Sequence, residues 1–212
     1  MDKDFTPVEI KRSPVALGQN MNLTGSPRKV KDTAADVFNT LHKWTELNKD
    51  GRNAINEIAN IKLDIILSKE AAIEENVSHR NNFPTSLEPL CQQLAEIYKK
   101  MEKCVNKLEG FAQVMEGLHQ LESYRSSKSE ETISPMFHTW HITHFVEATQ
   151  EVFKSYKKEL SLKKMIIENV CHATDRNTMM FYIAAWVHQP YITGDATLLV
   201  ESMLTETGHR GC

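Results

Sequence analysis

The sequence predicts an all-α protein built mainly from long helices. Apolar residues recur at every third or fourth position over long stretches, which is the period of one helix face. No stretch keeps the alternation of a strand, and eight glycines and seven prolines in 212 residues are few for a fold rich in tight turns. We expect a long-helix bundle with coiled-coil character, a small helical C-terminal unit and a disordered N-terminal tail.

Residues 1–30 are expected to form this disordered tail. They lack a sustained apolar period and contain three prolines and two glycines. The tail is basic, because residues 1–31 carry a net charge of +3 while the whole chain carries −3. A dedicated duplex-binding domain has a basic face. Because the net charge of the whole chain is negative, we expect no direct sequence-specific contact with nucleic acid.

Residues 31–121 are expected to form a long helical hairpin or coiled coil. A helix can begin near Asp32 and keep apolar residues at helical spacing to residue 67. Gly51 interrupts this pattern, so the segment is either one long helix with a weak point or two stacked helices. Residues 68–86 lose the period and contain Pro84, which predicts a loop.

The strongest periodicity lies in residues 87–118, where ten apolar residues alternate at spacings of three and four. This heptad keeps one seam against a partner helix, and such a helix spans roughly 48 Å. The partner is either residues 32–67, in an antiparallel hairpin, or another chain, including a second copy in a homodimer. The seam residues are Leu87, Leu90, Leu94, Ile97, Met101, Cys104, Leu108, Phe111, Met115 and Leu118.

The second half of the chain is expected to be a linker followed by helices. Residues 122–136 are polar and charged, which predicts a flexible linker. Residues 137–212 hold a long helix and two short ones that Asp175 and Asp195 can cap. Gly208 lies where a helix C-terminus favours glycine.

The four cysteines form no C-x-x-C pair. We interpret them as thiols of an intracellular protein and not as a disulfide framework. No stretch approaches the ~20 apolar residues that cross a bilayer, and the N-terminus has no apolar run of a signal peptide. We expect no membrane association.

Three histidines, His138, His141 and His144, recur at every third position. Helical residues three apart are rotated around the axis, so the three do not face one metal ion, and no acidic residue or cysteine nearby completes a ligand set. We expect no metal site. The aromatic residues among them are predicted to pack where a helix enters the fold, or to form an exposed docking edge.

Motifs of catalysis are missing from the sequence. There is no G-x-S-x-G, no glycine-rich phosphate loop and no C-x-x-C. We therefore expect a protein that is not an enzyme and has no catalytic residues and no cofactor.

Candidate phosphorylation sites gather outside the expected helices. Ser26 begins the pattern Ser-Pro-x-Lys of proline-directed kinases, and Ser13 and Ser134 are minimal Ser-Pro sites. Ser129 precedes two glutamates, which suits an acid-directed kinase. Basic residues at 11–12 and 28–31 loosely resemble a split nuclear-localisation signal.

Several ordered motifs resemble the cyclin-dependent kinase 2-interacting protein family, from about residue 28 to the C-terminus. They include Phe137-His138-Thr139-Trp140, Trp186-x-His188-Gln189-Pro190-Tyr191 and Glu201-Ser202-Met203-Leu204. Aromatic and polar residues in the first two are our candidates for partner docking: Phe137, His138, Thr139, Trp140, Trp186, His188, Gln189, Pro190 and Tyr191.

The resemblance implies a non-enzymatic nuclear adaptor. Its implied partners are cyclin-dependent kinase 2 complexes, the origin-firing kinase, origin and helicase components, and the partner protein of the damage-checkpoint kinase. The implied processes are the cell cycle and cell division, DNA replication, and DNA damage repair. The alternative is a constitutive structural subunit of an AAA-type ATPase complex, which would act in replisome proteostasis and ribosome maturation.

Overall fold

The computed structural model describes residues 23–74, 85–127 and 135–210. Within these ranges the chain forms helices and no strand, which confirms the all-α class. The helices are α1 (Ser26–Glu74), α2 (Leu87–Ser126), α3 (Ile142–Asn169), the 3-10 turn η2 (Val170–His172), α4 (Arg176–His188) and α5 (Gly194–Glu206). In the described residues, none of the helices is long and apolar enough to cross a membrane.

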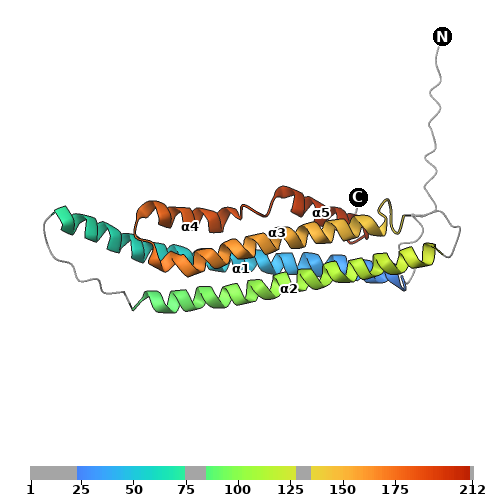
Figure 1. Cartoon of the computed structure of the whole chain (residues 1–212), viewed down its shortest axis with the longest axis horizontal. Helices are drawn as coiled ribbons and strands as arrows, with labels where there is room; N and C mark the ends of the chain where they lie inside the picture. The colour runs from blue at the N-terminus through green and yellow to red at the C-terminus, as the bar shows by residue number, and fades with distance from the viewer. Residues whose placement is uncertain (1–22, 75–84, 128–134, 211–212) are drawn as a thin grey trace, which may run out of the picture.

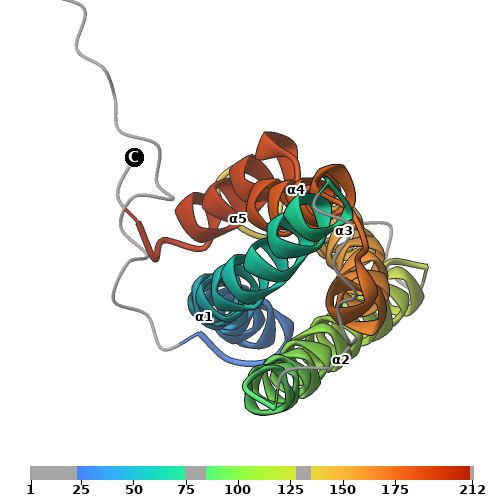
Figure 2. The same cartoon turned by 90° about the vertical axis from the view of Figure 1, so that its left-hand side faces the viewer.

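The three long helices lie side by side, and consecutive ones run in opposite directions (Figure 1). Seen end-on, α1, α2 and α3 occupy the corners of a triangle (Figure 2). The short helices α4 and α5 follow one another along the outside of α1 and α3. The molecule is therefore a three-helix bundle with a second layer on one side.

Helix α1 begins at Ser26, so the predicted boundary of the tail at residue 30 is wrong. Gly25 has a φ of +69°, which glycine adopts without a steric penalty, and its carbonyl accepts a hydrogen bond from Lys29 N at 3.2 Å. Val30 and Ala34 are fully buried one turn apart. Their burial gives the first turns of α1 an apolar contact that the sequence pattern did not reveal. Residues 1–22 lie outside the described residues.

Gly51 does not break α1, which continues as one helix to Glu74. A Cβ at this position would lie 2.8 Å from Cε2 of Trp186 and closer still to Cζ2. The glycine therefore lets the Trp186 indole approach the backbone of α1. The predicted loop 68–86 is also too long, since α1 ends at Glu74 and α2 starts at Leu87.

The predicted seam of α2 faces the inside of the bundle. Leu87, Leu94, Met101 and Met115 are at most 1% exposed, and α2 packs on both α1 and α3. Each large aliphatic side chain buried in this way contributes about 1.5–3 kcal/mol. These seam residues are thus covered within one chain, as in the hairpin alternative, with α3 as a second partner.

The linker between α2 and α3 begins later than the sequence predicted, because α2 extends to Ser126, which lies within the expected linker. The rest of that linker, residues 128–134, lies outside the described residues. Asp175 caps α4, with its Oδ1 accepting from Thr178 N at 2.8 Å. Asp195 lies in the first turn of α5, whose N-cap is Thr193. Gly208 has a φ of +68° after α5.

The expectation that the cysteines are all thiols is contradicted at one pair. Cys91 of α2 and Cys171 of η2 form a disulfide, with Cα atoms 7.5 Å apart. The turn η2 carries Cys171 back over α2, a proximity that 80 residues of separation concealed. Cys104 is a free, buried thiol, and Cys212 lies outside the described residues.

Candidate functional site

The aromatic residues of the motif at 137–140 pack into the end of the bundle. The ring centroids of Phe137 and Trp140 lie 5.5 and 5.0 Å from that of Phe145, both in edge-to-face geometry. Phe145 is fully buried, and the other two rings are half-buried. The packing interpretation therefore describes these two rings better than an exposed docking edge does.

Glu206, at the end of α5, holds this motif in place. Its carboxylate accepts hydrogen bonds from Thr139 N at 2.9 Å, from Trp140 N at 3.2 Å and from the Thr139 hydroxyl. Burial acts to raise the pKa of Glu206, but the hydrogen bonds from Thr139 and Trp140 outweigh it and the pKa is lowered. The carboxylate thus ties the entry of α3 to the end of α5.

The three histidines lie around the start of α3: His138 precedes the helix, His141 is its N-cap residue, and His144 lies in its first turn. His138 and His144 are exposed, and the rings of His141 and His144 stack with centroids 6.0 Å apart. Across the described residues, no three side chains among His, Cys, Asp and Glu come together as a metal site.

Trp186, a predicted docking residue, is completely buried, so that prediction is wrong. Its Nε1 donates to the carbonyl of Asn48 at 3.0 Å, and its ring meets the bare backbone at Gly51. An indole buried with its N–H paired is a structural anchor. It fixes α4 on α1.

Beside Trp186 lies a buried ion pair. Lys163 Nζ is 3.2 Å from Glu159 Oε1, and both side chains are fully buried. This approach is an ion-pair contact and not an aligned hydrogen bond. Nζ donates instead to Asn48 Oδ1 at 2.8 Å and to the carbonyl of Trp186 at 3.2 Å, and it lies 4.2 Å from the centroid of the Trp186 ring.

Burial shifts the pKa of both charged groups toward the neutral form. It lowers the pKa of Lys163 to about 8, against the attraction of Glu159. It raises the pKa of Glu159, although Lys163 and the backbone N–H of Tyr191 oppose that shift. Desolvation, with a smaller effect of Glu159, also raises the pKa of neighbouring Tyr156 to about 12.

Gln189 and Tyr191 complete this junction. Gln189 has a φ of +46° and its Oε1 accepts from Trp44 Nε1 at 2.8 Å. Tyr191 N donates to Glu159 Oε2 at 3.2 Å. The motif at 186–191 therefore joins α1, α3 and α4, and Gln189 has a structural role. Its exposed members are His188, Pro190 and Tyr191.

The outer side of α4 and α5 exposes large apolar side chains. Residues 177–200 contain a single charged residue, Asp195, apart from one histidine. Four side chains in this segment are exposed by 47–65%, and we call them the α4–α5 face: Met180, Phe181, Tyr191 and Leu198. Apolar surface depleted of charge is typical of the centre of a protein interface. Sequence reasoning missed Met180, Phe181 and Leu198, although the lack of charge was visible.

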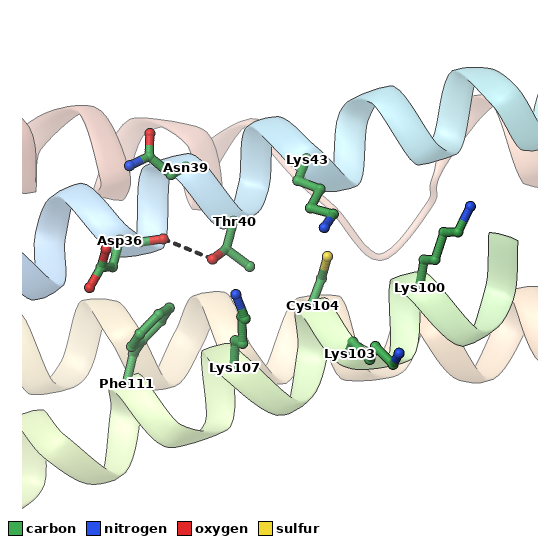
Figure 3. Close-up of a pocket in the computed structure, with 9 residues that line it drawn as sticks. All are labelled: Asp36, Asn39, Thr40, Lys43, Lys100, Lys103, Cys104, Lys107 and Phe111. Atoms are coloured by element: carbon green, nitrogen blue, oxygen red, sulfur yellow. Dashed lines mark hydrogen bonds between the residues drawn. The ribbon is translucent and has the colours of Figure 1, made fainter.

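A second surface, distinct from the α4–α5 face, lies between α1 and α2. Figure 3 shows lysines from both helices around a groove, with the ribbons of the C-terminal helices behind them. We call it the lysine groove, and its volume is about 610 Å³. Its lining residues are Asp36, Asn39, Thr40, Lys43, Lys100, Lys103, Cys104, Lys107 and Phe111.

Of the four phosphorylation candidates, Ser26 alone lies within the described residues. Ser26 is 4% exposed, and its hydroxyl donates to Glu122 Oε1 at 2.6 Å. It is therefore a helix residue in contact with α2, contrary to the prediction of a free site in a disordered tail. Ser13, Ser129 and Ser134 lie outside the described residues.

The described chain is a helical bundle with exposed apolar side chains on α4 and α5 and a lysine-lined groove between α1 and α2, and exposed apolar surface is typical of protein-interaction modules. The chain is 37% identical to the cyclin-dependent kinase 2-interacting protein of Mus musculus, over 96% of this chain and 99% of that protein. It is 36% and 35% identical to the proteins of that name from Xenopus laevis and Homo sapiens, in each case over 89% of this chain and 92% of the relative. No family model matches the chain.

The chain thus belongs to the cyclin-dependent kinase 2-interacting protein family. These relatives are named for an interaction and not for a reaction. That agrees with the resemblance identified from the motifs.

Proposed function

We propose that this chain is a non-enzymatic adaptor that binds cyclin-dependent kinase 2 through the α4–α5 face. The names of the relatives supply the kinase. The choice of this surface rests on the exposure of Met180, Phe181 and Leu198 in a segment with one charged residue. Burying such side chains against a partner provides the apolar contact that dominates most protein interfaces.

We further propose the wider role that the resemblance implies. In it, the chain joins cyclin-dependent kinase 2 and the origin-firing kinase to replication and damage-checkpoint complexes in the nucleus. A small helical bundle supports such a role because its separate faces can hold different partners at once. The support for these named partners is the resemblance alone.

The direct test is binding of purified cyclin-dependent kinase 2, with and without its cyclin, to the immobilised chain. We expect the wild type to bind and Phe181→Glu to bind roughly tenfold or more weakly, because a charge replaces an exposed apolar anchor. Leu67→Glu is the matched control, since Leu67 is 54% exposed on α1. Failure of the wild type to bind, or equal losses in both variants, would reject the proposal.

A wash in high salt separates the adaptor from the alternative of a permanent ATPase subunit. An adaptor should release its kinase, whereas a structural subunit should keep an AAA-type ATPase in a fixed stoichiometry. Recovery of the ATPase alone after the wash would favour the second function.

A further inference from the structure

The four lysines of the lysine groove converge from two helices. Lys100, Lys103 and Lys107 lie at i, i+3 and i+7 on α2, which places them on one face. Lys43 comes from α1 and lies opposite them (Figure 3). All four are exposed. Within the described residues, none of them forms an ion pair.

The interior of the groove is uncharged, whereas its rim carries the four exposed lysines. The Cys104 thiol and Thr40 are buried at its base, and Phe111 is half-buried at one end. Desolvation raises the pKa of Cys104, although Lys43 and Lys107 act to lower it. The thiol therefore stays protonated and neutral, so that the charge of the groove is the charge of its lysines.

The groove is also asymmetric along its length. Asp36 and Phe111 lie at one end, and Lys43 and Lys100 lie toward the other (Figure 3). The one carboxylate of the groove repels acidic side chains from the Phe111 end. An occupant would place negative charge among the lysines and an apolar side chain near Phe111.

We infer that the lysine groove is a docking site for an acidic peptide segment of a partner protein, with an apolar residue beside its acidic run. Charge complementarity specifies the acidic run, because four unpaired ammonium groups attract carboxylates and steer their approach. The rise from Lys100 to Lys107 is about 10 Å, which an extended peptide covers in about three residues. This inference goes beyond the kinase assignment and does not depend on it.

The two glutamates of this chain at residues 130–131 do not suit the groove. The end of α2 lies nearly 20 residues beyond Lys107, roughly 30 Å along the helix. Seven residues span at most about 25 Å when fully extended, and they must also connect to Pro135. A partner protein is therefore the better source of the acidic segment.

The test measures fluorescence anisotropy of a labelled peptide with several consecutive glutamates followed by a leucine, titrated with the full chain. We expect saturable binding that weakens as salt rises. Lys103→Glu with Lys107→Glu should weaken it by about tenfold or more, because attraction becomes repulsion. The matched control is Lys154→Glu with Lys158→Glu, which makes the same charge change at the same spacing on α3 and should change affinity by less than about twofold.

A second comparison tests the apolar contact. A peptide with serine in place of its leucine should bind more weakly to the wild type. Phe111→Ala should abolish that difference while its circular dichroism spectrum stays helical. Equal losses in the two lysine double variants, or no binding by the wild-type chain, would overturn the inference. Binding of an RNA oligomer with no binding of the acidic peptide would also overturn it.

Discussion

Lys163 carries an ammonium group into the centre of the bundle, beside Glu159 and Trp186. Removing one member of a buried ion pair leaves the other charge uncompensated, which costs about 3–5 kcal/mol. We therefore expect Lys163→Met to lower the free energy of unfolding by roughly that amount in urea titrations. The double variant Glu159→Gln with Lys163→Met should lose less than the single one. A larger loss in the double variant would mean that the pair is not the relevant interaction.

The same pair should make stability depend on alkaline pH. The pKa of Lys163 falls from 10.5 to about 8 on folding, so the unfolded chain binds more protons between these values. Stability contributed by this group therefore rises with pH across that window. We expect the difference in unfolding free energy between the wild type and Glu159→Gln with Lys163→Met to grow from about pH 7.5 to about pH 9.5. A constant difference would show that the Lys163 pKa is not lowered.

Gly51 shows how one residue sets a helix-to-helix distance. Alanine is about 1 kcal/mol better than glycine inside a helix, but its Cβ would overlap the Trp186 indole. We expect Gly51→Ala to destabilise the chain by about 1–3 kcal/mol in denaturant titrations.

Gly117 of α2 is the matched control for Gly51, because a Cβ there meets nothing within 4 Å. Gly117→Ala should leave stability unchanged or raise it by up to about 1 kcal/mol. If both substitutions stabilise the chain, the close approach of Trp186 to α1 is wrong.

At the scale of elements, the sequence predicted helix faces better than helix ends. The heptad of α2 identified its buried seam, since a 3/4 spacing follows directly from helix geometry. The start of α1 was missed because Val30 and Ala34 are buried in a cluster whose other members, such as Met115 and Phe145, lie far away in the sequence. No pattern within the first 34 residues encodes those distant partners.

The position of Ser26 at the start of α1 gives that element a testable charge contact. Its hydroxyl is 2.6 Å from a carboxylate oxygen of Glu122, so a negative group there meets a like charge, although the helix N-terminus offsets part of the repulsion. We expect Ser26→Asp to lower the unfolding free energy by about 1–2 kcal/mol and Glu122→Gln to reduce that loss, as measured by thermal melting.

Ser161→Asp, at an exposed serine of α3, is the control for the Ser26 variant and should have a small effect. The same loss from Ser26→Asp with and without Glu122 would contradict the contact. Phosphorylation of Ser26 should likewise disturb the α1–α2 junction, in contrast to the sequence-based view of an independent tail.

For the whole molecule, the motif resemblance identified the family, but it led us to assign a docking role to residues that have a structural role. Trp186 and Gln189 were expected to contact a partner, but they connect α4 to α1. Buried aromatic residues and docking aromatic residues look alike in a sequence. Only the packing of α4 on α1 distinguishes Trp186, which is buried, from Phe181, which is 56% exposed.

Neither the buried polar contacts around Lys163 nor the lysine groove could be predicted from the sequence, and the physical reason is the same for both. Asn48, Glu159 and Lys163 come from two helices more than 100 residues apart, and the groove joins α1 to α2. In the sequence, Lys163 is a lysine at one position of an otherwise mostly apolar repeat in residues 145–170. Tertiary packing decides whether such a residue is exposed or buried.

Hydrogen exchange of the chain, alone and with saturating cyclin-dependent kinase 2, tests the central claim most directly. We propose that the kinase covers the α4–α5 face, so amides of α4 and the following turn, residues 180–191, should exchange more slowly in the complex. Amides of α2 around Lys103 should change little. Protection confined to α1 and α2, or an unchanged exchange pattern with the kinase bound, would contradict the account.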